Sequence, residues 1–94
     1  MALPHAQALE VINVRPLGPR LSGNVSTSLL KTDQLQLMRL LLPAGQRLPE
    51  HHVPGEVTIQ CLEGRISVVT PGTTIDMAAG ELTLLPGAEP HSVL

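Results

Sequence analysis

The sequence of 94 residues predicts an all-β protein, and three observations support this fold class. Nine prolines and eight glycines divide the chain into short segments. The apolar runs between them recur about every 8–12 residues, which is the spacing of strands in a sandwich or barrel. Hydrophobic residues make up 43% of the chain and charged residues 15%, which is enough for one core. We therefore expect a single domain spanning residues 1–94.

The first expected strands lie before residue 31. Residues 8–14 alternate loosely and predict a first strand. Pro16 and Pro19 end this strand, because proline cannot donate a hydrogen bond to a ladder. Residues 26–30 form a second β-type run, and Thr32-Asp33 predicts the turn that follows it.

Residues 34–42 are expected to form the next strand. Leu35, Leu37 and Leu41 share one face of it. The opposite face becomes apolar near the end, as in a strand that is buried on both sides there. A helix is the competing interpretation, because Leu, Gln and Met favour helices. We favour the strand, because turn residues flank the segment closely.

The C-terminal half predicts four more strands separated by glycine-containing turns. The first two of these strands are expected to form a hairpin around Glu63-Gly64. The strands are residues 57–62, 65–70, 73–77 and 82–85, and the turns are centred on Pro43-Ala44-Gly45, Glu63-Gly64, Pro71-Gly72, Ala79-Gly80 and Pro86-Gly87.

Charge and composition exclude several classes of partner. A net charge of −2 and the absence of aromatic residues argue against nucleic acid and against an anionic membrane surface. No apolar run approaches the roughly 18 residues that a membrane helix needs. Cys61 is the only cysteine, which favours a reducing compartment. The N-terminus lacks the features of a secretory signal, so we expect a cytoplasmic protein.

Histidines mark the candidate functional residues. His51, His52 and His91 can converge only through the fold. With Glu50 or Glu56 nearby, they supply the nitrogen and oxygen ligands that suit a divalent first-row metal. A histidine such as His91 is also common as an ordinary half-buried residue, so spacing alone leaves both interpretations open.

The residues around these histidines resemble the two motifs of the cupin family, of the small conserved-barrel type. The first motif of that family is matched at Gly45, His51 and Gly64, and the second at Gly80, Pro86 and His91. The similarity covers about residues 35–94. It implies a small jelly-roll, or double-stranded β-helix, barrel that is cut short at its C-terminus. Residues 1–30 would then form an N-terminal arm.

The resemblance implies a metal site for Zn, Mn, Fe or Ni with the ligands His51, His52, Glu56 and His91. Two positions depart from the family pattern: Val53 replaces the second histidine, and Val57 stands at the glutamate position. The offset of one residue turns Glu56 away from the barrel interior, because strand side chains alternate. A bulge near Pro54-Gly55 would restore its direction. Ala88 replaces a glycine of the second motif, a mild change if its φ is negative.

We therefore expect a small cupin barrel that binds a divalent metal and a small polar molecule. The relatives include dioxygenases, isomerases and decarboxylases, so the resemblance does not choose a reaction. One alternative is a non-catalytic binding or sensing barrel with a degraded metal site. There, His51 and His91 would face an apolar pocket lined by Val53, Val57, Ile59 and Cys61. Another alternative is a purely structural dimeric barrel.

A homodimer is expected because a barrel cut short at residue 94 would expose strand edges, which a second subunit would cover. We expect the N-terminal residues to make that contact. Cys61 is expected to be a core residue rather than a nucleophile. Arg39 and Arg47 are candidates for binding an anionic group, although a lone arginine on a strand or turn is usually solvated.

Overall fold

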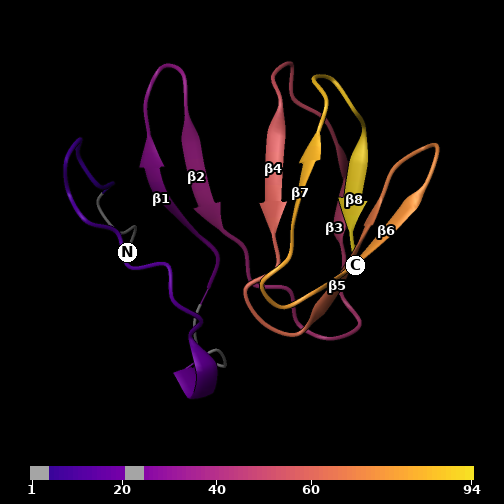
Figure 1. Ribbon diagram of the computed structural model, residues 1–94, viewed down its shortest axis with the longest axis horizontal. Coiled ribbons are helices and arrows are strands. Elements are labelled where there is room, and N and C mark those ends of the chain that lie inside the picture. The colour runs from indigo at the N-terminus through magenta and orange to yellow at the C-terminus, as the bar shows by residue number, and fades with distance from the viewer. Residues whose placement is uncertain (1–4, 21–24) are drawn as a thin grey trace. The chain divides into compact units, whose positions relative to one another are not determined.

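The computed structural model describes residues 5–20 and 25–94 and confirms the all-β class. The chain divides into two units, Met1–Leu41 and Leu42–Leu94. Every strand pairing in the described residues is antiparallel (Figure 1). Among these residues, no helix has the length and apolar character needed to cross a membrane. The elements are the 3-10 helix η1 (Gly18–Arg20) and the strands β1 (Thr27–Lys31), β2 (Gln36–Arg39), β3 (Leu48–His51), β4 (Val57–Gln60), β5 (Arg65–Val69), β6 (Thr74–Ala78), β7 (Leu82–Leu85) and β8 (His91–Val93).

The first unit contains the β1–β2 hairpin. Thr32 forms its turn, since its hydroxyl oxygen accepts the backbone N–H groups of Gln34 and Leu35 at 3.1 and 3.0 Å. The strand predicted for residues 8–14 is wrong, because this segment belongs to no ladder. A local turn replaces it: the N–H of Glu10 donates to the carbonyl of Gln7 at 3.1 Å.

The strand predicted for residues 34–42 is confirmed as β2, and the competing helix is not formed. The expected burial on both faces is limited to the end of the segment, where Leu41 and Leu42 are half-buried. Leu37 is 39% exposed, and Met38 and Leu40 are 50% and 51% exposed. Arg39 is half-buried, and its guanidinium Nη2 donates to the backbone carbonyl of Asn13 at 3.1 Å.

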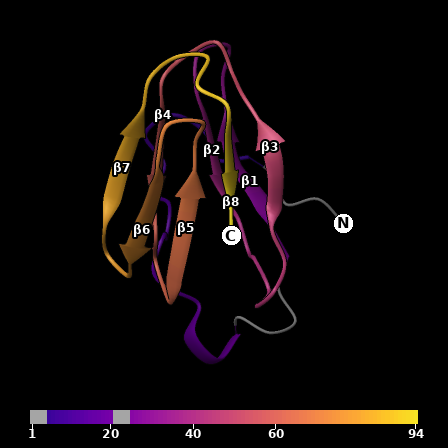
Figure 2. The same ribbon diagram turned by 90° about the vertical axis from the view of Figure 1, so that its right-hand side faces the viewer.

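The second unit consists of two antiparallel sheets that enclose a small core. One sheet has the strand order β3-β8-β5-β6 and the other is the pair β4-β7 (Figures 1 and 2). Both contribute to the core, because strand side chains alternate and each sheet turns one row inward. The buried core residues are Cys61, Val68, Met77, Leu85 and Val93, with Leu42, Leu48, Val57, Ile59, Ile66 and Ile75 packed against them. The described strands form open sheets, and no closed barrel is found among them.

The hairpin predicted for residues 57–62 and 65–70 is wrong, although both strands exist. β4 pairs with β7, whereas β5 pairs with β6 and β8. The β4–β7 ladder continues past Gln60, because the N–H of Cys61 donates to the carbonyl of Glu81 at 3.0 Å. Gly64, with a φ of 73°, lies where the chain passes from one sheet to the other. The hairpin in this region is instead β5–β6, around the predicted Pro71-Gly72 turn.

Strands β3 and β8 were not predicted. Pro49 lies within β3, and proline is normally absent from central strands. It is tolerated because β3 is the edge strand of its sheet. β8 has only three residues and follows a proline, so its sequence carries little strand signal.

Candidate functional site

The ladder between β3 and β8 brings the two predicted histidine positions together. His51 and His91 are direct partners in this antiparallel pair, and the register shifts between Leu48 and His51. Directly opposed residues of such a pair have Cα atoms about 4.5–5.5 Å apart. The side chain of His51 lies outside the described part of the structure. The backbone therefore brings the two positions side by side, as the motif spacing predicted.

His91 is a buried histidine whose ring is held by the backbone. Its side chain is only 3% exposed. It lies on the same face of β8 as Val93, which belongs to the core. Nδ1 of His91 is 3.0 Å from the backbone carbonyl of Glu89. A carbonyl can only accept a hydrogen bond, so Nδ1 is the donor in this contact. This contact fixes the orientation of the buried imidazole.

The other two predicted ligands, His52 and Glu56, are exposed in the loop between β3 and β4. Glu56 immediately precedes β4, whose Val57 and Ile59 pack toward the core. Alternation along the strand leaves Glu56 on the opposite side, and the bend at Pro54-Gly55 does not bury it. Within the described residues, no three His, Cys, Asp or Glu side chains lie close enough to hold a metal ion.

Two loops close one end of the second unit beside the paired histidine positions. The N–H of Ala88 donates to the carbonyl of Val53 at 2.8 Å. A Cβ added to Gly87 would lie 2.5 Å from the carbonyl oxygen of Pro54. Only glycine permits this approach, so the two loops that carry the resemblance are packed directly together. The φ of Ala88 is 61° and not negative. The replacement of the glycine of the second cupin motif by Ala88 is therefore not the mild change that a negative φ would have made it.

Arg47 contacts the outer side of β8. Its Nη2 donates to the hydroxyl of Ser92 at 3.4 Å. Ser92 is 4% exposed and lies on the opposite face of β8 from His91. Arg47 is exposed. Because it contacts Ser92, it lies on the side of β8 opposite to His91.

Cys61 is a core residue, as predicted. Its side chain is 2% exposed. The thiol donates to the backbone carbonyl of Glu63 at 3.4 Å. A buried thiol whose proton is held by a carbonyl is a poor nucleophile, because the thiolate is the reactive form.

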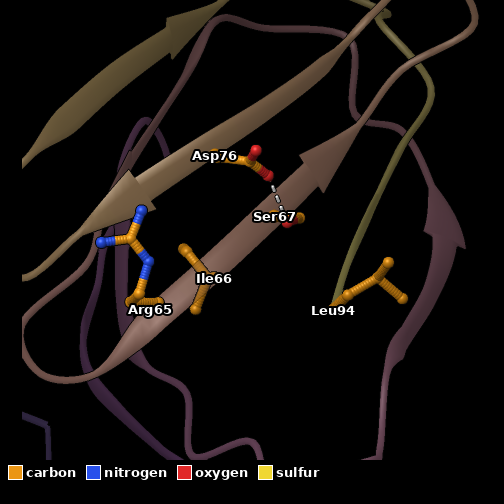
Figure 3. Close-up of a pocket in the computed structure, with 5 residues that line it drawn as sticks. All are labelled: Arg65, Ile66, Ser67, Asp76 and Leu94. Carbon is orange, nitrogen blue, oxygen red and sulfur yellow. Dashed lines mark hydrogen bonds between the residues drawn. The ribbon is translucent and has the colours of Figure 1, made fainter.

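An open depression that the sequence did not indicate lies on the outer face of the β5–β6 hairpin (Figure 3). It has a volume of about 290 Å³ and contains none of the predicted ligands. The hydroxyl of Ser67 donates to Oδ1 of Asp76 at 2.6 Å across the two strands. The lining residues are Arg65, Ile66, Ser67, Asp76 and Leu94. Its lining residues come from β5, β6 and the C-terminal residue Leu94. They form no motif in the sequence, so the sequence did not predict the depression.

No known family profile matches the sequence, and no curated protein is significantly similar to it. The fold is similar to the crystal structure of a conserved protein of unknown function from Streptococcus pyogenes, with a TM-score of 0.70. The two sequences are 21% identical, and the similarity covers 99% of this chain and 85% of the other. At this level of identity the similarity concerns the fold alone.

Proposed function

We propose that this chain is a small cupin-type jelly-roll protein that binds a divalent metal ion and a small polar molecule at His51 and His91. The observation that carries the proposal is the direct pairing of these two positions in the β3–β8 ladder. They belong to different motifs of the resemblance and are distant in the sequence. Their backbone adjacency is what a shared binding site would require.

The state of His91 supports the same proposal. The backbone carbonyl that accepts the hydrogen bond of Nδ1 holds the buried imidazole in one orientation, as is usual for a metal-binding histidine. Zn, Mn, Fe and Ni all accept imidazole ligands. A bound ion would supply Lewis-acid polarisation to a coordinated molecule. The contribution of His91 is to hold its donor atom in one orientation.

Metal analysis of the untagged protein tests this proposal. We expect near-stoichiometric metal in the wild type and at least about tenfold weaker binding in His51→Ala and His91→Gln. Glutamine keeps much of the buried volume of histidine, so the second substitution limits the loss of packing. Stabilisation of the fold by added metal, read as a rise in Tm, should disappear in the same variants.

His5→Ala is the matched control, because His5 is an exposed histidine of the first unit. It should bind metal as the wild type does. Full metal content in both His51→Ala and His91→Gln would contradict the proposal, and so would an equal loss in His5→Ala.

A second candidate function is a non-catalytic binding or sensing barrel with a degraded metal site. The exposure of His52 and Glu56 favours it, because a two-imidazole site without a carboxylate holds metal weakly. A thermal-shift screen after treatment with a chelator distinguishes the two functions. If the protein is a sensing barrel, organic ligands should raise its Tm without metal. If it binds a metal, organic ligands should raise its Tm only when the metal ion is present. A response to neither would favour the purely structural barrel.

A further inference from the structure

The outer face of the β5–β6 hairpin carries one cation and one anion. Ile66 and Ile75 pack against the core, so their neighbours Arg65 and Asp76 turn outward, and both are exposed. Asp76 pairs with Ser67, two residues beyond Arg65, so the charged residues are diagonal neighbours. Diagonal positions in a sheet are about 7–8 Å apart. No ion pair joins these two described side chains (Figure 3), so opposite charges share one face without contact.

The hydrogen bond between Ser67 and Asp76 leaves both side chains with acceptor oxygens. The single proton of the Ser67 hydroxyl goes to Oδ1 of Asp76, at 2.6 Å. The lone pairs of Ser67 Oγ and the second carboxylate oxygen of Asp76 can still accept. The backbone N–H and carbonyl of Ser67 both pair with Leu94, at 3.2 and 2.9 Å. The pair is therefore a fixed group of acceptors, which suits a donor such as an ammonium ion.

Arg65 has the opposite requirement. Its guanidinium has only donors and stays charged, so it suits a carboxylate. No described residue bonds to this guanidinium, which borders the same depression. Figure 3 shows it apart from the Ser67–Asp76 hydrogen bond. A molecule that contacts both groups would therefore need an ammonium group and a carboxylate.

The depression between these groups has the size of a small molecule. We call it the outer β5–β6 depression, and its volume is about 290 Å³. Small-molecule sites begin at about 300 Å³. Ile66 and Leu94 add an apolar part to its lining, and Leu94 is 46% exposed. An amino acid with an apolar side chain carries all three of the matching groups.

We propose that the outer β5–β6 depression binds a free amino acid with an apolar side chain. The ammonium group donates to Asp76 and Ser67. The carboxylate accepts from Arg65, and the side chain contacts Leu94. His91 lies on the core side of the same sheet, so this site does not depend on the proposed metal site. The contacts are exposed, so we expect a dissociation constant on the order of 1 mM.

Titration of the 15N-labelled protein with L-leucine, followed by amide shifts in NMR spectra, tests the proposal. Metal is first removed with a chelator, so the result does not depend on the metal site. Saturable shifts should centre on the depression. Asp76→Asn and Arg65→Gln should each weaken binding at least about threefold, because each removes one charged contact. Asp33→Asn is the matched control, since Asp33 is an exposed carboxylate of the first unit, and it should bind leucine as the wild type does.

Two analogues of leucine test the charges of the ligand without changing the protein. Leucine methyl ester keeps the ammonium group, and N-acetylleucine keeps the carboxylate. Each should bind at least about threefold more weakly than leucine. Because Arg65 and Asp76 are exposed, both variants should keep the wild-type circular dichroism spectrum. The proposal would be overturned by a lack of saturable shifts, by shifts centred on His91, by either analogue binding as tightly as leucine, or by equal affinities in Asp76→Asn and Asp33→Asn.

Discussion

At the scale of single residues, Ala88 shows how a conformation can conflict with a side chain. Its φ of 61° lies in the left-handed region. That conformation costs an L-residue about 1–2 kcal/mol, because Cβ crowds the following carbonyl oxygen. Glycine avoids this cost but loses more conformational entropy on folding. The strain at Ala88 is sustained by its own N–H, which donates to the carbonyl of Val53.

We therefore expect Ala88→Gly to stabilise the protein by about 0.5–1 kcal/mol. Urea unfolding measures the change in the free energy of unfolding. Ala79→Gly is the control, since Ala79 is exposed and its φ is not positive. It should be slightly destabilising. Destabilisation by Ala88→Gly as large as that by Ala79→Gly would mean that residue 88 does not hold the left-handed conformation in solution.

Val68 tests the core in the same way. It is the most completely buried residue described, with 0% exposure, and it pairs with both Ile75 and Val93. Val68→Ala removes two methyl groups and leaves a cavity, so we expect a loss of about 2 kcal/mol. Val53→Ala is the control at 40% exposure and should cost about 1 kcal/mol or less. Equal losses in urea unfolding would show that the core is not centred on Val68.

The sequence predicted the positions of the candidate site residues better than it predicted the directions of their side chains. The positions of His51 and His91 and the burial of Cys61 follow from motif spacing and apolar neighbours. The exposure of Glu56 follows from an offset of one residue, which the sequence left open because a bulge would have reversed it. The φ of Ala88 depends on a loop contact with Val53 that no local pattern encodes.

At the scale of elements, strand existence was predictable and strand pairing was not. Turn residues delimit β4, β5, β6 and β7 in the sequence. The choice of β7 as the partner of β4 depends on which face of each strand reaches the core. A local hairpin around Glu63-Gly64 would have placed β4 and β5 in one sheet. The two strands instead lie in different sheets, and the segment that joins them carries the buried Cys61.

The contact between the 86–88 turn and the 53–55 loop gives a prediction for these elements. Gly87→Ala should destabilise the protein by about 1–3 kcal/mol, because the new Cβ would meet the Pro54 carbonyl oxygen. Gly72→Ala is the matched control, since nothing lies within 4 Å of its added Cβ. It should be neutral or slightly stabilising.

The same pair of variants reports on the site, since the displaced loops flank β3 and β8. We expect Gly87→Ala to weaken metal-dependent stabilisation more than Gly72→Ala does. Thermal unfolding with and without added metal provides the measurement. Unchanged stability in Gly87→Ala would show that the two loops are further apart in solution.

At the scale of the whole molecule, the core is small for the chain that surrounds it. The buried hydrophobic residues described are five, whereas large hydrophobic side chains remain exposed on several strands. A chain of this length gains limited stability from one core, and association is a common way to increase it. The sequence expectation of a second copy was based on strand edges.

If folding and association are linked, Tm should rise with protein concentration, because a dimer that binds only the folded chain stabilises it by mass action. We expect this dependence in the wild type. Differential scanning calorimetry at several concentrations measures it. A Tm that is independent of concentration in the wild type would contradict the expected link between folding and association.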